Sequence, residues 1–474
     1  MSDKAKKILF KNQARQKIFK GIHFIADAIK TNLGKSCDDF DGDFVKELIS
    51  NYIKDDFEKI GAEFALKTVY ETKKTSHDGA TTALIMLNAI LKDGIELIGN
   101  QISPQDINKQ LDLALTDLIS ELEKITYFIK DPKDITKIVD YYSCYNKTVS
   151  NSIVKCFEKT GLTGTIVVEK TDSTNTIEII DGLEINQGYL SRYFCTSEEN
   201  MTAELNFCNV LIVDRKISST LEIFPLLKQM TRSKKGLLII AKDIHEDVIS
   251  TLAMNKLQGM INIAAVKSPF NQPKLIKDIA ILTNAKIITK EDSLLDLSPT
   301  ALGNSDKVIV YKDKTIIGLK KPHHNTSSHL KNKIAIIGIS NSDENEQKQL
   351  YENCVTKAKN AIEQGVIAGG NVGLFFALQS LDKSNIGVKI LETAIYTPMM
   401  QIISNAGHEP EPILDKICKM GYPNGFNLSS CKVENFFNCG ILDPVKVVKS
   451  SLFHAVSNAK MILLTDALII NASS

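Results

Sequence analysis

The spacing of apolar residues changes twice along this chain of 474 residues, and that change narrows the possible folds more than any other feature. In the first third, isoleucines and leucines recur every three to four residues, as at Ile18, Ile22 and Ile25, which is typical of helices with one buried face. Between about residues 163 and 290, helix-like segments alternate with short β-rich runs, and helical spacing returns from Glu344 to the end. We therefore predict a multidomain α/β protein in which an α/β unit is inserted into a mainly helical domain. The predicted strands cover residues 165–168, 210–213, 237–240, 261–266 and 286–289.

The composition excludes some classes of partner. The chain is longer than one hydrophobic core usually supports, so two or three domains are expected. Hydrophobic residues make up 43% and charged residues 24%, and a formal net charge of +1 gives no electrostatic reason to expect nucleic acid or a membrane as a partner. Residues 1–7 are polar and basic, and no apolar run follows that fits a signal peptide or a bilayer span. A cytoplasmic location is therefore expected.

The nine cysteines are predicted to be free structural thiols. They are scattered, form no CxxC pair and have no histidine nearby at the spacing of a zinc site. Buried free cysteine is common in proteins, and no other role is needed to explain these residues. They are Cys37, Cys144, Cys156, Cys195, Cys208, Cys354, Cys418, Cys431 and Cys439.

Residues 78–82 (Asp-Gly-Ala-Thr-Thr) are the first candidate for an anion site, since the common GxxxxGK[ST] and GxGxxG motifs are absent. They stand directly before an apolar helix predicted from Ala83 to about Ile98, whose first N–H groups would point at a phosphate together with the threonine hydroxyls. Asp78 would suit Mg²⁺, which prefers carboxylate and phosphate oxygens. An ordinary turn followed by a helix cap explains the same residues, and this alternative stays open.

Residues 365–370 (Gly-Val-Ile-Ala-Gly-Gly) are the second candidate, again just before an apolar helix that continues through Leu378. Glycines let the backbone approach a ligand closely. The alternative is a helix C-cap followed by tight packing. The residues of the two segments do not by themselves decide between an anion site and these structural alternatives.

Six segments in the same order resemble group I chaperonins, the GroEL type, and the resemblance extends over nearly the whole chain. The strings GYLSRYF and GILDP are similar to the family's GYLSPYF and GILDP, and GVIAGG to its GVVAGG. The predicted first helix and the Asn-Leu-Gly turn after it resemble the family's first helix and its TLG turn. The string DFEKIGA resembles the family's KFENMGA, and HDGATT resembles its GDGTTT. These segments cover residues 10–34, 56–62, 77–82, 188–194, 365–370 and 440–444.

The resemblance implies a GroEL-like subunit with three domains. A helical equatorial domain is expected from residues 1–124 and 359–474. A small intermediate domain is expected from residues 125–179 and 331–358, and the inserted α/β unit, residues 180–330, corresponds to the apical domain that binds polypeptides.

The resemblance also implies a nucleotide site for ATP, with Mg²⁺ held by Asp78 and K⁺ as a further cofactor. Carried over position by position, the site comprises Leu33, Gly34, Asp78, Gly79, Ala80, Thr81, Thr82, Gly370, Asn427 and Asp443.

A polypeptide-binding surface on the apical domain is implied in the same way. Most of its residues are apolar here, and an exposed apolar strip usually marks an interaction surface. A core position is the alternative for each of them. The residues are Tyr189, Tyr193, Phe194, Phe224, Leu227, Ile249, Ala253 and Met254, with the polar Asn255 beside them.

One departure from the family bears on catalysis. The family's catalytic aspartate lies twelve residues before the first glycine of GVVAGG, and that position is Asn353 here. The neighbouring Glu352 does not replace it, because one residue is about 100° around a helix. Losing a general base bears directly on turnover.

The sequence therefore favours a chaperonin-like protein that binds non-native polypeptides and ATP, with very slow hydrolysis. Two alternatives stay open: a fully active ATP-dependent folding chaperonin, and a regulatory or structural subunit that assembles with another chaperonin. The partners implied by the resemblance are non-native polypeptides, a co-chaperonin, and other subunits in a homo-oligomeric or mixed ring.

Overall fold

The computed structural model describes residues 6–34, 42–171, 176–197, 201–233, 235–269, 272–319, 333–340 and 345–471. Its contacts divide the chain into two compact units, each with its own core. The helical unit comprises Met1–Val154 and Gln349–Ser474, and the sheet unit comprises Lys155–Lys348. The inserted unit of the prediction is thus present as a continuous segment between two parts of a helical unit.

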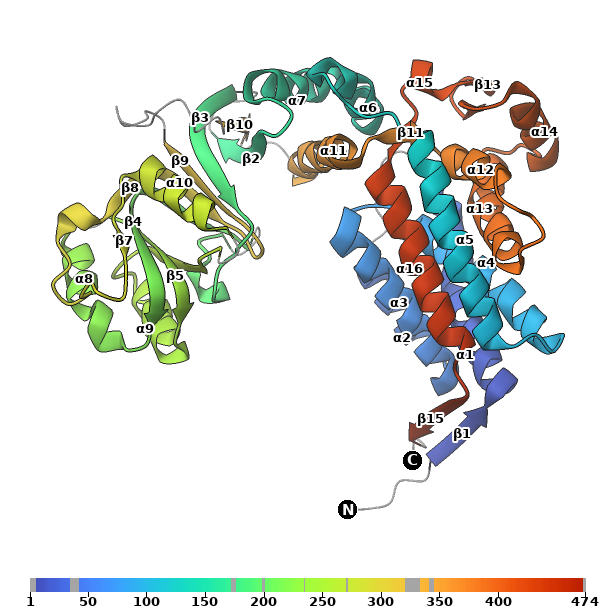
Figure 1. Cartoon of the computed structure of the whole chain (residues 1–474), viewed down its shortest axis with the longest axis horizontal. Coiled ribbons are helices and arrows are strands. Elements are labelled where there is room, and N and C mark those ends of the chain that lie inside the picture. The colour runs from blue at the N-terminus through green and yellow to red at the C-terminus, as the bar shows by residue number, and fades with distance from the viewer. Residues whose placement is uncertain are drawn as a thin grey trace. The chain divides into compact units, whose positions relative to one another are not determined.

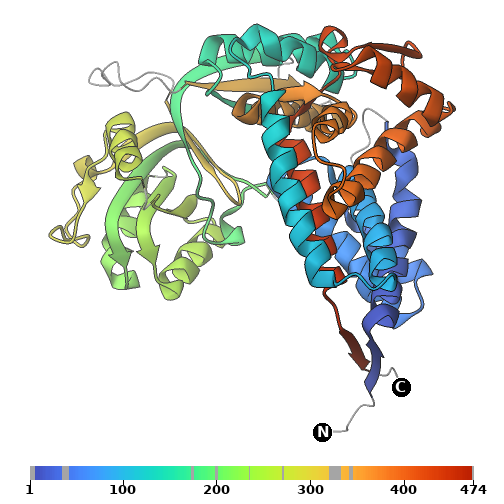
Figure 2. The ribbon, with the colours of Figure 1, turned by 45° about the vertical axis from the view of Figure 1, so that its right-hand side comes forward.

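The helical unit is a bundle of long helices. They are α1 (Lys11–Ile29), α3 (Asp56–Ser76), α4 (Ala80–Gly99), α5 (Pro104–Lys124), α13 (Ile386–Asn405) and α16 (Val445–Leu463). Helix α4 is mostly apolar, with Leu84, Met86, Leu87 and Ile90 fully buried, as expected for a helix inside a bundle. It contacts α1, α3, α13 and α16, while α5 (cyan) runs beside α16 (red) in Figures 1 and 2.

Shorter elements complete the helical unit. The helices are α2 (Gly42–Tyr52), α6 (Ile135–Tyr142), α12 (Val372–Gln379), α14 (Pro410–Met420) and α15 (Phe436–Cys439), with 3₁₀ turns at Lys30–Asn32 and Pro132–Asp134. Three antiparallel strand pairs join β1 (Lys6–Phe10) to β15 (Ala467–Asn471), β11 (Val366–Ala368) to β14 (Leu442–Pro444), and β12 (Asn424–Asn427) to β13 (Lys432–Asn435). Helices α7 (Lys147–Thr160) and α11 (Asn345–Gln364) each cross a boundary between the units.

The sheet unit holds one mixed sheet. Its strands are β2 (Thr165–Thr171), β3 (Thr176–Ile185), β4 (Ala203–Ile217), β5 (Leu237–Ile244), β6 (Ile263–Lys267), β7 (Ile287–Ile288), β8 (Gly303–Val310), β9 (Thr315–Leu319) and β10 (Lys333–Ser340). They follow the order β2-β10-β3-β9-β8-β4-β5-β6, with β7 beside β4. Strands β4, β5 and β6 are parallel, whereas β8 is antiparallel to β4 and β9.

The parallel part of this sheet is covered by helices. Strands β5 and β6 are apolar runs that are buried along nearly their whole length, as expected for parallel strands with both faces covered. The helices of the unit are α8 (Thr220–Ser233), α9 (Glu246–Leu257) and α10 (Pro273–Thr283), with 3₁₀ turns at Arg192–Phe194 and Pro299–Ala301 (Figure 1).

Each predicted strand coincides with an observed one, namely β2, β4, β5, β6 and β7. Strands β3, β8, β9 and β10 were not predicted, and β10 shows that the α/β region extends past residue 290. Strand β10 pairs with β2 on one side and β3 on the other. It follows β9 in the sequence, so the last strand of the unit lies beside the first two. The division into three domains, with bounds at residues 124, 179, 330 and 358, stays a prediction. Among the residues that the structure describes, no helix combines the length and apolar character needed to cross a bilayer.

Candidate functional site

The turn between α3 and α4 is held by two serine hydroxyls. His77 ends α3 with φ 58°, and Gly79 precedes α4 with φ 80°. The hydroxyl of Ser76 donates to the carbonyl of Asp78, and that of Ser451 to the carbonyl of Gly79, both at 2.9 Å. A Cβ at Gly79 would lie 2.1 Å from Oγ of Ser451, so this position requires glycine both for its φ and for space.

The first turn of α4 has no side-chain cap. Ala80 is buried, and Thr81 and Thr82 are half-buried beside it. The alternative to an anion site at residues 78–82 was an ordinary turn followed by a helix cap. The turn is present, but the helix has no side-chain cap. The uncapped N–H groups at this end of α4 are suited to an anion, because the helix dipole adds positive charge there.

The second glycine segment lies against the GILDP string. Strands β11 and β14 place Ile367 opposite Asp443, and the N–H of Gly370 donates to Oδ2 of Asp443 at 2.9 Å. Gly365 ends α11 with φ 80°, and its N–H donates to the carbonyl of Ala361, so the C-cap alternative is correct for this glycine. Gly370, with φ 59°, has open space where a side chain would be.

A cavity of about 340 Å³ lies in the helical unit, a volume within the range of small-molecule sites. It is lined by three of the predicted nucleotide residues, Gly34, Gly370 and Asn427. The amide of Asn427 is held by Glu434, to which it donates at 2.9 Å. The rest of the lining is mostly apolar: Val372, Met399, Ile402, Ile403, Ile417, Phe426, Leu428, Phe436 and Ile441, with Tyr141, Cys144, Tyr145 and Ser429.

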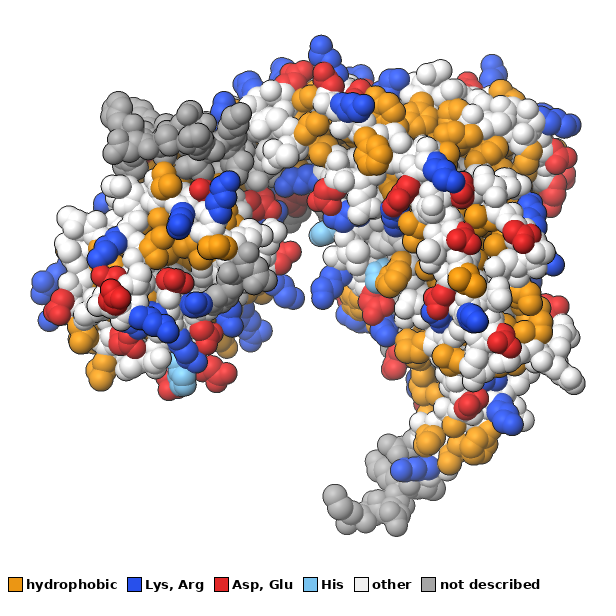
Figure 3. All heavy atoms as spheres, viewed as in Figure 1, with side chains coloured by type: hydrophobic (Ala, Val, Ile, Leu, Met, Phe, Trp, Pro, Cys, Tyr) orange, Lys and Arg blue, Asp and Glu red, His pale blue; other side chains and the backbone are white. Residues whose placement is uncertain are grey.

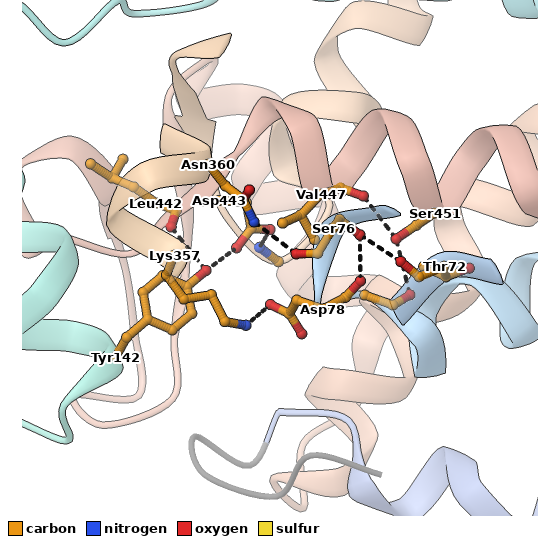
Figure 4. A network of polar contacts seen from close by, with 12 residues as sticks. Thr72, Ser76, Asp78, Tyr142, Lys357, Asn360, Leu442, Asp443, Val447 and Ser451 are labelled. Atoms are coloured by element: carbon orange, nitrogen blue, oxygen red, sulfur yellow. Dashed lines mark hydrogen bonds and ion pairs between the residues drawn. The ribbon is translucent and has the colours of Figure 1, made fainter. Parts of the chain in front are cut away.

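The other predicted nucleotide residues do not line this cavity. Leu33 is buried directly before Gly34, and its carbonyl accepts from the Asn405 amide at 2.9 Å. Asp443 is connected to the cavity through its hydrogen bond with Gly370. Asp78, two residues before α4, belongs to a polar cluster that also includes Asp443 (Figure 4).

Lys357 of α11 is one of the residues of this cluster that were not predicted from the sequence. Its Nζ forms an ion pair with Oδ2 of Asp78, and the side chain is only 12% exposed. Nζ also lies 4.8 Å from the centre of the Tyr142 ring, within the range of a cation–π contact. The hydroxyl of Tyr142 donates to the carbonyl of Leu442 and to Asp443, at 3.3 and 3.4 Å (Figure 4).

The cluster contains two carboxylates with different surroundings. Burial raises the pKa of Asp443, while the Gly370 N–H and the Lys357 charge act in the opposite direction. Burial also raises the pKa of Tyr142 well above its usual value, and the negative charge of Asp443 adds to this effect. Tyr142 therefore stays a neutral hydrogen-bond donor at physiological pH.

Asn353 lies on the same face of α11 as Lys357. Residues three or four apart on a helix are neighbours, so Asn353, Lys357 and Asn360 form one stripe. Asn360 sits at the far end of that stripe and donates to the carbonyl of Ser76 at 2.7 Å. The stripe thus faces the turn between α3 and α4. In the sequence, only the four-residue spacing from Asn353 could have indicated Lys357 as a residue of the site.

The donor atoms present do not form a ready site for Mg²⁺. Asp78 is the predicted ligand, and its carboxylate is already paired with Lys357. Within the described ranges, no three His, Cys, Asp or Glu side chains come together as a metal-binding group. A magnesium ion prefers several carboxylate and phosphate oxygens and would have to compete with an ammonium here.

The prediction of free thiols needs one correction. Cys144, which lines the cavity, is disulfide-bonded. Cys37 lies outside the described residues. Free thiols are found at Cys156, Cys195, Cys208, Cys354, Cys418, Cys431 and Cys439.

The predicted polypeptide surface of the sheet unit is only partly exposed. Tyr193, Phe224 and Met254 are 50%, 63% and 53% exposed, on the Arg192–Phe194 turn, α8 and α9. Hydrophobic side chains (orange) reach the surface in the region of α8 in Figure 3. Half-buried positions are occupied by Tyr189, Ile249 and Asn255, and the Asn255 amide donates to the carbonyl of Thr251 at 2.8 Å.

Three of the predicted surface residues belong to the core instead. Phe194 is fully buried, and Leu227 and Ala253 are nearly so. They pack in the main core of the sheet unit, so the alternative core position is correct for them. Two residues that were not predicted, Leu221 on α8 and Leu257 on α9, are 75% and 62% exposed. We call the exposed set Tyr193, Leu221, Phe224, Met254 and Leu257 the apolar strip.

Comparisons with known proteins agree with this architecture. The TCP-1/cpn60 chaperonin family matches residues 62–473. Chaperonin GroEL 3 of Protochlamydia amoebophila (strain UWE25) is 30% identical over 520 aligned positions, which cover 98% of this chain and 97% of that protein. A crystal structure of the chaperonin gp146 from the bacteriophage EL 2 (Pseudomonas aeruginosa), in presence of ATP-BeFx, matches with a TM-score of 0.71 and 16% identity. That match covers 98% of this chain and 99% of gp146, and at this identity it concerns the fold alone.

A helical unit is made from both ends of the chain, and a sheet unit is inserted between them. Together with the family match, this architecture defines the protein as a chaperonin. The predicted GroEL-like fold class is thereby confirmed. The chain belongs to the TCP-1/cpn60 chaperonin family. Membership supports a role in protein folding, with polypeptide substrates and assembly into rings.

Proposed function

We propose that this chaperonin captures non-native polypeptides on the apolar strip and binds ATP in the cavity of the helical unit, with very slow hydrolysis. The observation that carries the nucleotide part is the convergence of Gly34, Gly370 and Asn427 around one cavity of about 340 Å³. Three segments far apart in the sequence supply these residues. Their convergence supports the position-by-position resemblance on which the site rests.

The side chains and backbone groups near the cavity suggest how a nucleotide would be held. The mostly apolar lining favours a base and ribose, and Gly370 leaves room for close approach of the ligand to the backbone. The uncapped start of α4 offers N–H groups for phosphate, with the hydroxyls of Thr81 and Thr82 beside them. ATP supplies the phosphoanhydride bond whose hydrolysis drives a chaperonin cycle.

Slow hydrolysis follows from Asn353. An asparagine amide carries no charge and is not basic, so it does not activate water as a carboxylate does. Mg²⁺ at Asp78 and K⁺ remain predictions from the resemblance. So do a cytoplasmic location, a co-chaperonin partner and the choice between homo-oligomeric and mixed rings. The fully active chaperonin and the co-assembling subunit remain the alternatives to this proposal.

One purified sample tests these points. ATP affinity, steady-state ATP hydrolysis and capture of a chemically denatured test protein are measured together, after native mass spectrometry has excluded contaminating host chaperonin. We expect ATP binding and polypeptide capture, with hydrolysis about a hundred- to ten-thousandfold below that of a working chaperonin. Hydrolysis at an ordinary chaperonin rate would overturn the role given to Asn353. Mixed rings from the native cell would instead favour the co-assembling subunit.

A further inference from the structure

Lys357 occupies an unusual place among acidic groups. Its ammonium pairs with Asp78, the predicted metal ligand, and contacts the face of the Tyr142 ring. The same charge also acts on Asp443, which is hydrogen-bonded to the cavity glycine Gly370. One cation therefore pairs directly with the first carboxylate of the cluster, as Figure 4 shows for Asp78, and acts electrostatically on the second, Asp443.

The contacts of Lys357 hold its ammonium in place. The lysine side chain is 12% exposed and that of Asp78 is 26% exposed, so the ion pair is partly shielded from solvent. Partial burial strengthens the attraction between opposite charges and equally the repulsion between like charges. A divalent cation at Asp78 would therefore meet the ammonium at short range, in addition to losing one of its carboxylate oxygens to it.

A lysine ammonium can itself act on a nucleotide. It is a compact point charge with three donors, and lysine is a common phosphate ligand in nucleotide-binding proteins. Next to Asp78 it already neutralises the carboxylate that would otherwise repel a triphosphate. Both tasks, neutralising Asp78 and providing positive charge near the phosphates, are those that a bound metal would perform.

We propose that Lys357 takes the place of the divalent cation, so that this chain binds ATP without Mg²⁺. The inference rests on the proposed ATP site and deepens it. It concerns binding only and makes no claim about the chemical step.

The test compares ATP affinity of the intact protein in excess Mg²⁺ and in excess EDTA, by isothermal titration calorimetry. Wild-type protein is expected to bind with affinities that differ by less than about threefold between the two conditions. Lys357→Met keeps most of the length of the side chain and removes its charge. For this variant we expect affinity in EDTA to fall by about 10- to 100-fold, the effect of losing one charge-assisted contact, and Mg²⁺ to restore it by occupying the freed Asp78.

Lys446→Ala is the matched control. Lys446, on α16, pairs at 2.7 Å with Glu363, which lies on α11 outside the polar cluster, and loss of Lys446 should leave both affinities unchanged. Wild-type binding that requires Mg²⁺ would overturn the inference while leaving the ATP site intact. Absence of binding in both conditions would overturn the ATP site itself. The wild-type comparison decides the matter even if Lys357→Met fails to fold.

Discussion

The backbone N–H of Gly370 donates a hydrogen bond of 2.9 Å to Oδ2 of Asp443, which lies 73 residues later in the chain. Pairing of β11 with β14 makes this contact possible by placing Ile367 opposite Asp443. The two motifs that looked independent in the sequence, GVIAGG and GILDP, are therefore one structural unit at the edge of the cavity. Asp443 orients a glycine that lines the cavity.

A close approach at Gly79 gives the first prediction. Gly79→Ala would force a Cβ to within 2.1 Å of Ser451 Oγ at φ 80°, and we expect a loss of about 2 kcal/mol or more in stability. Thermal unfolding should show a decrease in Tm of about 4 °C or more. Gly99→Ala in the same helix is the control, since no atom lies within 4 Å of its Cβ position and stability should not fall. An unchanged Tm for Gly79→Ala would contradict the tight turn.

The sequence was sufficient to predict most of the fold. Helical and β-rich periods reflect burial by neighbouring elements, so they predicted the inserted α/β unit and five of its strands. The first half of strand β8 is polar, with Asn304 and Ser305 directly after Gly303, and these residues hide the apolar period of the strand. Strand β10 lies beyond the region where the alternation of strands and helices was recognised.

The site was less predictable, because its contacts join residues far apart in the chain. Lys357 and Asp78 are 279 residues apart, and no local pattern connects them. The burial of Leu227, by contrast, was predictable from spacing. Buried residues of α8 recur at Ile223, Leu226, Leu227 and Met230, which is one helical face.

Exposed apolar residues of α8 and α9 give the second prediction. Phe224 and Met254 are exposed, and an apolar side chain buried on binding contributes about 1.5 to 3 kcal/mol before ordering costs. The double change Phe224→Ser and Met254→Ser should weaken capture of a chemically denatured test protein by about tenfold or more, with little change in Tm. The measurement is the affinity for the test protein by fluorescence anisotropy.

Two controls separate surface from core in this experiment. Phe453→Ser removes an aromatic residue that is 53% exposed on α16 of the helical unit, and it should not affect capture. Phe194→Ala removes a fully buried aromatic ring of the sheet unit and should cost about 3 to 5 kcal/mol of stability. Undiminished capture by the folded double variant would place the binding surface elsewhere.

His454 gives the third prediction, which concerns pH. Its Nε2 lies 3.1 Å from the hydroxyl of Thr75 and its Nδ1 lies 3.7 Å from Glu71. Burial lowers the pKa of His454 below its usual 6.5, and the Glu71 charge opposes this shift only in part. The unfolded chain therefore binds a proton more readily than the folded protein, so stability is full above pH 6.5 and falls as pH decreases toward the folded pKa.

Urea unfolding at a series of pH values from 7.5 to 5 measures this effect. His454→Gln should reduce the loss of stability at acidic pH, because the neutral side chain has no proton to gain. His23→Gln, on an exposed part of α1, is the control and should follow the wild-type curve. Identical pH profiles for wild type and His454→Gln would exclude His454 as the source.

The last prediction concerns hydrolysis and depends on the spacing between Asn353 and Lys357. A carboxylate introduced by Asn353→Asp would lie one helical turn before the lysine ammonium on the same face of α11. An acid placed four residues before a lysine pairs well with it. Such pairing lowers the pKa of the new carboxylate, and a weaker base is a poorer catalyst of proton removal.

We therefore expect Asn353→Asp alone to recover little hydrolysis, and Asn353→Asp with Lys357→Met to recover more, by about tenfold or more over wild type in the presence of Mg²⁺. The second change also frees Asp78 from its ion pair, so that both the metal ligand and the base become available. Steady-state phosphate release by purified rings is the measurement. Asn353→Asp with Lys446→Ala is the matched control. It also removes one paired lysine, because Lys446 pairs with Glu363, a residue of α11 outside the cluster. Equal rates for the two double variants would mean that Lys357 does not restrain a base at position 353. Full recovery by Asn353→Asp alone would leave Asn353 as the sole cause of slow turnover.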